Sequence, residues 1–150
     1  MKFIISILLT ALIVLQAQGQ ETNPFNLSIG ANYSLRMSSN EGVILIDPYS
    51  YSPQLEINAG MNGFEVFARL GNISTIGVKT GNSFALVGVA YDYAPLSIAK
   101  QNHVVSFEFT LHKEVFKNAT LYVYTKHGFN IYDFKYVFSP INVGLTFRLN

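Results

Sequence analysis

Hydrophobic and polar residues alternate along most of this chain. The last segment, INVGLTFRLN, is apolar at every odd position from Ile141 to Leu149 and is polar or glycine at every even position. Residues 25–37 show the same alternation over thirteen positions. A period of two is that of a β-strand, whose side chains point alternately to opposite faces. The pattern therefore predicts an all-β protein.

Turn residues divide the alternating pattern into eight predicted strands. Asn62-Gly63 is the strongest hairpin signal and predicts a type I′ turn. Residues 64–80 are predicted as one strand because the alternation keeps its phase across Gly71-Asn72, although a turn there would give two strands. Residues 42–47 are apolar on both faces and show no phase. The predicted strands are 25–37, 42–47, 54–61, 64–80, 83–93, 104–112, 119–131 and 141–149.

The charged residues of the predicted strands all share the polar face. The apolar face carries no Asp, Glu, Lys or Arg, whereas the polar face combines charges with many Gly, Ser, Thr and Asn residues. The charged members of the polar face are Arg36, Glu56, Glu65, Arg69, Lys79, Glu108, Lys126 and Arg148.

Two architectures fit this division of faces. In a soluble barrel or sandwich the apolar face points inward, and in a membrane barrel it points outward to lipid. Only 13% of the residues are charged, against about 25% in soluble domains, and small polar residues suit the narrow interior of an eight-stranded barrel. Several tyrosines fall near predicted strand ends, where membrane barrels carry aromatic girdles. These features favour a single antiparallel up-and-down membrane barrel of about eight strands.

The beginning of the chain predicts export. Lys2 precedes a nearly continuous apolar run to Leu15, and Ala17-Gln18-Gly19 has the small residues of a cleavage site. Residues 1–19 are therefore predicted to be a signal peptide and residues 20–150 the barrel domain. The sequence contains no cysteine, so disulfides cannot stabilise the exported fold. A membrane location without an apolar helix after the leader requires a closed barrel.

The charged polar face predicts a closed lumen. Five basic and three acidic side chains would face a narrow interior, where an isolated charge is costly and oppositely charged groups should pair. We expect such a network to block conduction. Alternatively, several of these residues lie in water at the rims.

The C-terminal segment GLTFRLN, together with the leader and the alternating strands, resembles small outer-membrane β-barrel proteins of Gram-negative bacteria, especially the Bacteroidota type. In that family the last strand is read by the barrel-assembly machinery, and the last residue is usually aromatic, whereas this chain ends in Asn150. The resemblance implies an outer-membrane location, contact with outer-membrane lipid, and an assembly signal formed by Val143, Leu145, Phe147 and Leu149.

A second segment, VGVAYDYAPLSIAKQNHVVSFEF (87–109), is similar to a late hairpin of the barrel proteins associated with type IX secretion. The matching positions are Tyr91, Asp92, Tyr93 and His103. Those proteins are much longer, so no function is carried over from them.

The sequence has no motif for catalysis or cofactor binding. His103, His112 and His127 lack metal-ligand spacing, and the glycines form no phosphate-binding loop. The formal net charge is +1 without a basic cluster, which argues against nucleic acid. We therefore predict no enzyme activity, no cofactor and no metal, with a lipid-hydrolysing barrel as the remote alternative.

These observations predict a structural or interaction role in the outer membrane. The loops around 38–41, 94–102 and 132–140 would be displayed outside to an extracellular or envelope protein, and Asp47–Pro53 would be a long periplasmic turn. The main alternative is a soluble exported barrel that binds a lipid or another apolar ligand in its interior.

Overall fold

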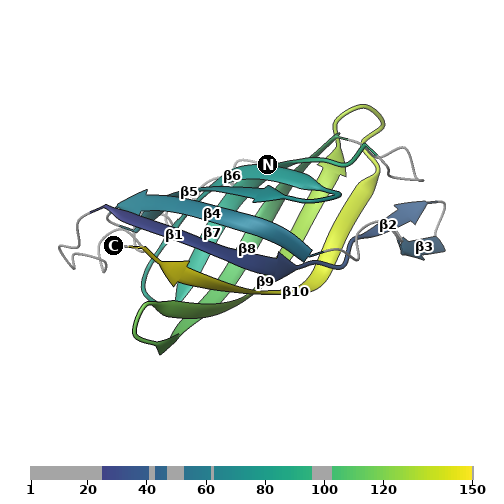
Figure 1. Ribbon diagram of the computed structural model, residues 1–150. Coiled ribbons are helices and arrows are strands. Elements are labelled where there is room, and N and C mark those ends of the chain that lie inside the picture. Colours follow the sequence, from purple (N-terminus) through teal and green to yellow (C-terminus); the bar gives the residue numbers. More distant parts are fainter. Residues whose placement is uncertain (1–24, 41–42, 47–52, 62, 96–102, 150) are drawn as a thin grey trace.

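The protein is a closed antiparallel β-barrel (Figure 1). A computed structural model describes residues 25–40, 43–46, 53–61, 63–95 and 103–149. The predicted signal peptide lies outside these residues. The eight wall strands are β1 (Asn26–Tyr33), β4 (Pro53–Met61), β5 (Phe64–Leu70), β6 (Ser74–Gly81), β7 (Ala85–Tyr93), β8 (His103–Phe116), β9 (Ala119–Asn130) and β10 (Tyr136–Arg148).

The wall closes by pairing of the first strand with the last. β1 lies antiparallel to β10, with Ala31 opposite Leu145, and every other wall strand pairs with its neighbours in chain order. Closure leaves no edge in the wall and satisfies the backbone hydrogen bonds from strand to strand. The prediction of an antiparallel up-and-down barrel of eight strands is confirmed.

An extra hairpin extends the sheet beyond the wall. We call β2 (Met37–Asn40) and β3 (Val43–Ile46) the flap. β2 pairs with the upper part of β10, with Met37 opposite Phe138, and β3 pairs with β2 (Figure 1). β1 ends at Tyr33, opposite Val143, so the upper part of β10 has an edge free for β2. The predictions that residues 25–37 form one strand and that 42–47 belongs to the wall are therefore wrong.

The preference for a single strand over 64–80 is also wrong. β5 and β6 form a hairpin, with Arg69 opposite Thr75 and the three residues 71–73 between the strands. In this hairpin even-numbered residues lie opposite even-numbered ones, and odd-numbered opposite odd-numbered. Side chains at even positions therefore point outward on both β5 and β6. The alternation consequently passes through the turn unchanged and cannot reveal it.

The predicted loop 132–140 is shorter than expected because β10 begins at Tyr136. The register between β9 and β10 shifts between Ser139 and Asn142. Pro140 has no N–H to donate to the ladder, and such an interruption is a common place for a β-bulge.

The two ends of the barrel differ in the length of their connections. Gly63, Asn82 and Asn118 lie in connections of two or three residues at the end that holds both termini of the barrel. At the opposite end the chain passes from β1 to the flap and β4, from β5 to β6, from β7 to β8 and from β9 to β10, through longer connections. Pro53 lies at this opposite end, across from Tyr33, so its predicted place in a turn beside the termini is wrong; residues 47–52 lie outside the described part.

The strand faces have the polar residues inside. Along β4, Gln54, Glu56 and Asn58 are buried, whereas Leu55 and Ile57 are exposed by 45% and 39%. The same division holds around the wall, so the apolar side chains cover the outer surface. In the described residues, no helix is long and apolar enough to cross a membrane.

Candidate functional site: the ion-paired interior

The centre of the barrel is filled by one cluster of charged and aromatic side chains. We call Glu56, Arg69, Glu108, Tyr122 and Tyr124 the central cluster. They come from β4, β5, β8 and β9, and each is on an inward position of its strand. None of the five is more than 4% exposed. The cluster therefore fills the middle of the lumen rather than a rim.

Arg69 is the hub of the central cluster. Its Nε donates to Glu56 Oε2 at 2.7 Å, while Nη1 and Nη2 donate to the two oxygens of Glu108 at 2.5 and 2.7 Å. The guanidinium carbon lies 4.3 Å from the Phe67 ring centroid and 4.2 Å from that of Tyr124. Two carboxylates and two aromatic faces thus compensate for the removal of this cation from water.

Glu56 joins further strands to this hub. Its Oε2 also accepts hydrogen bonds from the Tyr122 hydroxyl and, at 3.1 Å, from Asn32 Nδ2. The Tyr124 hydroxyl donates to Asn32 Oδ1 at 3.2 Å. One polar network therefore ties β1, β4, β5, β8 and β9 together across the lumen.

Glycine makes room for the central tyrosine. A Cβ on Gly144 would lie 2.1 Å from atoms of the Tyr122 ring, so no side chain fits at that inward position of β10. Gly77 stands in the same relation to the Phe67 ring, at 2.6 Å. The glycines on the polar face thus allow large side chains from facing strands to fill a narrow barrel.

A second ion pair lies nearer the end opposite the termini. Lys126 Nζ is 2.5 Å from Asp92 Oδ1, and the Thr75 hydroxyl donates to the same oxygen at 2.6 Å. Asp92 was absent from the charged face predicted from the sequence. The sequence does contain the signal that places Asp92 inside. Asp92 shares one face of β7 with Gly88 and Ala90, whereas the outward face of this strand carries Ala, Val and Tyr.

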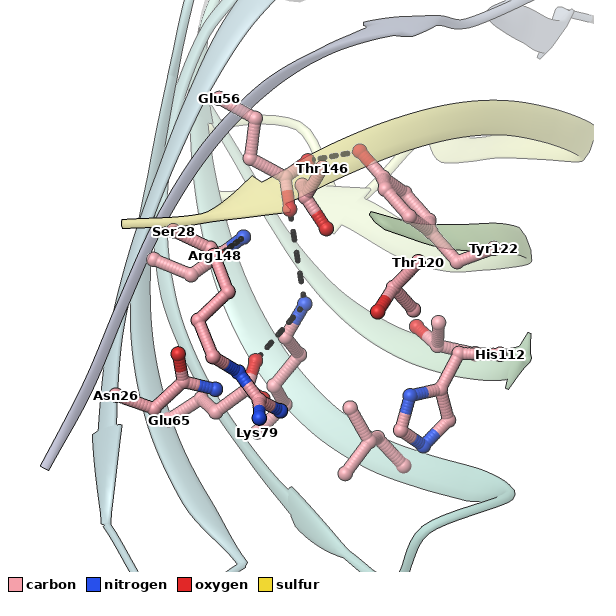
Figure 2. A pocket seen from close by; sticks show the side chains of 13 residues that line it. Asn26, Ser28, Glu56, Glu65, Lys79, His112, Thr120, Tyr122, Thr146 and Arg148 are labelled. Carbon is pink, nitrogen blue, oxygen red and sulfur yellow. Dashed lines mark hydrogen bonds and ion pairs between the residues drawn. The ribbon is translucent and has the colours of Figure 1, made fainter. Parts of the chain in front are cut away.

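A small polar cavity lies between the central cluster and the terminal end (Figure 2). Its volume is about 90 Å³, and all eight wall strands contribute to its lining. Lys79 projects into it, 3.7 Å from Glu56 Oε1 and 3.4 Å from Glu65 Oε2. Asn58 Oδ1 and Glu56 Oε1 are buried there without a hydrogen-bond partner. The space and its polar lining suit ordered water.

The structure brings together most of the charged residues predicted from the sequence. Glu56, Arg69 and Glu108 meet directly, with Lys79 and Glu65 linked to Glu56 through longer ion pairs. Lys126 pairs with Asp92, and Arg36 is buried although it follows the end of β1. Arg148 does not join an ion pair among the described residues and lies exposed at the cavity mouth.

The buried charges are nearly balanced. Arg36, Arg69, Lys79 and Lys126 face Glu56, Asp92, Glu108 and the partly exposed Glu65. Equal numbers of cations and carboxylates limit the cost of keeping ions away from water. The sequence does not reveal the role of Tyr122 and Tyr124, because uncharged tyrosines on inward positions of 119–131 look like ordinary strand residues.

A small polar group around Thr125 lies on the outer wall. Thr125 Oγ1 donates to the Ser139 carbonyl at 3.2 Å and lies 3.1 Å from His127 Nε2, whose Nδ1 contacts the Tyr136 hydroxyl. This chain of hydrogen bonds satisfies a carbonyl at the Pro140 bulge, where the ladder is interrupted. A structural role accounts for the pairing of Thr125 with His127.

The predicted C-terminal assembly signal lies on the outer wall. Val143, Leu145, Phe147 and Leu149 follow one another on the outward side of β10 and just beyond it. His103 and His112 lie elsewhere, against Tyr91 and the Asn82 carbonyl. Among the residues that the structure describes, no group of His, Asp and Glu is arranged to hold a metal ion.

Comparisons of the chain with protein-family models, with curated proteins and with solved structures gave no match.

Proposed function

We propose that this protein is an outer-membrane β-barrel with a closed, non-conducting lumen, which presents the connections opposite its termini as an interaction surface. The observation that carries the proposal is the inverted distribution of side chains. Among the described residues, 33 large hydrophobic side chains are exposed, and seven charged side chains are buried, six of them on wall strands. A monomer in water rarely exposes apolar patches beyond a few hundred Å².

The outer wall is free of charge over the height of the barrel. Exposed Lys113, Glu114 and Lys117 belong to the β8–β9 hairpin where it extends past β7, whose pairing ends opposite Leu111. Asp133 and Lys135 lie in the connection at the opposite end. An apolar band bounded by polar ends is what a bilayer requires of a barrel.

The orientation follows from the connections. Bacterial outer-membrane barrels have short periplasmic turns and longer extracellular loops, with both termini in the periplasm. Here the short turns and the termini share one end. We therefore assign the flap and the connections 71–73, 94–102 and 131–135 to the extracellular side, where they would meet an envelope or extracellular protein.

The closed lumen follows from the central cluster. Arg69 and Glu56 have no exposed surface, and the hydrogen bonds of the cluster cross the barrel from wall to wall. Passage of an ion would require these pairs to break in a low-dielectric interior. The same interior disfavours a soluble barrel that binds an apolar ligand, because its cavity is lined mainly by polar side chains.

Fractionation of the full chain with its leader, expressed in a Gram-negative host, tests the location. Carbonate-washed membranes should retain the protein, and mild detergent should release a form whose mobility on a gel changes when the sample is heated. Release of the folded protein into the soluble periplasmic fraction would overturn the proposal. The exposed face would then meet water or a soluble partner.

A pair of substitutions tests lipid contact on the folded barrel. Val123, near the middle of β9, is 41% exposed, and Phe116, on the projecting hairpin, is 75% exposed. Val123→Arg should cost about 2–4 kcal/mol in a bilayer, and Phe116→Arg about 0–1 kcal/mol. Denaturant unfolding in lipid vesicles measures both. Equal and small effects would contradict burial of the wall in lipid, since exposed positions in water tolerate either change.

A further inference from the structure

The outward aromatic side chains differ between the two ends of the barrel. Among the described residues, the outward tyrosines lie at the end opposite the termini and are Tyr33, Tyr91, Tyr93, Tyr132 and Tyr136. The exposed aromatic residues at the terminal end are Phe25, Phe64, Phe84, Phe116 and Phe147. A tyrosine at a membrane surface buries its ring and keeps its hydroxyl among polar groups, whereas phenylalanine has no hydroxyl. The two ends of the wall therefore offer different chemistry to their surroundings.

His103 is the centre of a cluster of these tyrosines. It begins β8, opposite Tyr93 of β7, and its Nδ1 lies 2.5 Å from the Tyr91 hydroxyl. The ring centroids of Tyr93 and Tyr132 are 5.0 and 5.2 Å from that of the imidazole. Three tyrosines, from β7 and from the connection between β9 and β10, thus hold the imidazole in place. We call Tyr91, Tyr93, His103 and Tyr132 the rim cluster.

The contact with Tyr91 determines what the imidazole can offer to a ligand. A phenol is the better hydrogen-bond donor and an imidazole nitrogen the better acceptor, so the Tyr91 hydroxyl donates to Nδ1 and the ring proton lies on Nε2. Within the described part of the chain, Nε2 of His103 has no hydrogen-bond partner, and neither have the hydroxyls of Tyr93 and Tyr132. Neighbouring rings therefore present three donors without acceptors.

We propose that the rim cluster binds the phosphate of a lipid headgroup. Phosphate oxygens are charged acceptors, and a hydrogen bond to a charged acceptor is about twice as strong as one between neutral groups. The charged side chains of the adjoining connection, Asp133 and Lys135, pair with each other at 3.7 Å, so the Asp133 carboxylate has a cation beside it. The cluster thus offers donors to an anion without an uncompensated carboxylate in this connection.

The apolar wall beside the cluster supplies the lipid. Val105 lies opposite both Tyr91 and Phe129, and Val105 and Phe129 are exposed by 43% and 51%. Acyl chains that cover these side chains bring their headgroup to the level of the rim cluster. The proposal therefore rests on the proposed membrane location, and it names the headgroup chemistry that this end of the wall recognises.

His127 provides a contrast on the same wall. Its Nε2 lies 3.1 Å from Thr125 Oγ1, and its Nδ1 contacts the Tyr136 hydroxyl. Both ring nitrogens of His127 are thus used within the protein, whereas His103 uses one. An outward histidine is therefore not a headgroup site by itself, and the free Nε2 makes the difference.

Native mass spectrometry of the detergent-released barrel tests the site. Phosphatidic acid is the probe, and diacylglycerol with the same acyl chains is the comparison, because the two lipids differ only in the phosphate. The wild-type barrel should retain phosphatidic acid about tenfold more strongly, as one hydrogen bond to a charged group would give. Equal retention of the two lipids would overturn the proposal. Loss of the protein from carbonate-washed membranes, measured separately, is the result that would overturn the membrane location.

Two matched variants assign the preference to the rim cluster. His103→Phe keeps an aromatic ring among the tyrosines but removes both nitrogens, and it should reduce retention of phosphatidic acid to that of diacylglycerol. His127→Phe should keep the wild-type preference, and both variants should keep the heat-dependent gel shift. An unchanged preference in His103→Phe, or an equal loss in both variants, would overturn the proposal. Excess inorganic phosphate should leave the lipid bound; its displacement would assign the site to free phosphate instead.

Discussion

At the residue scale, the interior depends on one fully buried cation. Arg69 pairs with both Glu56 and Glu108. Much of this could be predicted: the alternation placed all three residues on one face, and the narrow lumen required them to pair. Which residues would meet depended on strand order, and the tyrosines of β9 carry no charge to indicate their role.

Replacement of the hub tests the energetic role of this pairing. Arg69→Met takes the guanidinium away from two buried carboxylates, with only the 3.7 Å contact between Lys79 and Glu56 left nearby, and should cost about 3–5 kcal/mol of unfolding free energy. Arg69→Met combined with Glu56→Gln and Glu108→Gln should recover most of that loss, because no unpaired charge is then buried. Denaturant unfolding of the refolded barrel in lipid or detergent gives the three values.

Arg148→Met is the matched control for this series. It removes the same side chain from an exposed position at the cavity mouth, so its effect should stay within about 0.5 kcal/mol. A loss as large for Arg148→Met as for Arg69→Met would contradict the argument. So would a combined variant that is no more stable than Arg69→Met alone.

At the scale of elements, some turns change the phase of the alternation and others do not. The β4–β5 hairpin pairs Met61 with Phe64, and the outward positions change there from odd to even. The β5–β6 hairpin leaves the phase unchanged, which is why 64–80 looked like one strand. The sequence therefore locates turns that change the phase, such as those at Asn62-Gly63 and at 82–84, and misses the turn at 71–73, which does not change it. The flap escaped prediction because its place depends on the free part of β10.

The two-residue turns allow a comparison of glycine with asparagine at the same backbone angle. Gly63 has φ 76°, and Asn118 in the β8–β9 turn has φ 75°. Gly63→Ala forces a Cβ into this conformation and within 2.6 Å of the Gly81 carbonyl oxygen. It should cost more than about 1 kcal/mol. Asn118→Gly should be neutral or slightly stabilising, because glycine adopts this angle without a penalty.

Unfolding of both variants in the same lipid or detergent measures the contrast. Similar losses for Gly63→Ala and Asn118→Gly would show that the turns do not depend on left-handed backbone geometry. A stabilising Gly63→Ala would contradict both the angle and the close approach to Gly81.

At the scale of the whole molecule, closure of the wall and filling of the lumen have the same cause. Eight strands enclose only enough space for side chains, and the inward positions of this chain combine glycine and small residues with large charged and aromatic ones. Where a glycine such as Gly144 faces a tyrosine, the ring of the tyrosine occupies the space that a side chain on β10 would need. The sequence could predict which face is polar, but not that the central cluster spans the lumen.

The filled lumen predicts an electrically silent protein. Reconstituted in a planar bilayer, the wild-type barrel should give no stable open channel, because ions would have to displace buried pairs that bulk salt screens weakly. Replacement of Arg69, Glu56 and Tyr122 together by Ala removes the side chains that cross the lumen and should produce measurable conductance. Phe116→Ala, outside the lumen, should remain silent. Stable channels in the wild-type protein would contradict the closed lumen without affecting the membrane location. Silence of the triple variant, with its heat-dependent gel shift intact, would mean that the remaining inward side chains, among them Tyr124 and the Asp92–Lys126 pair, keep the barrel closed.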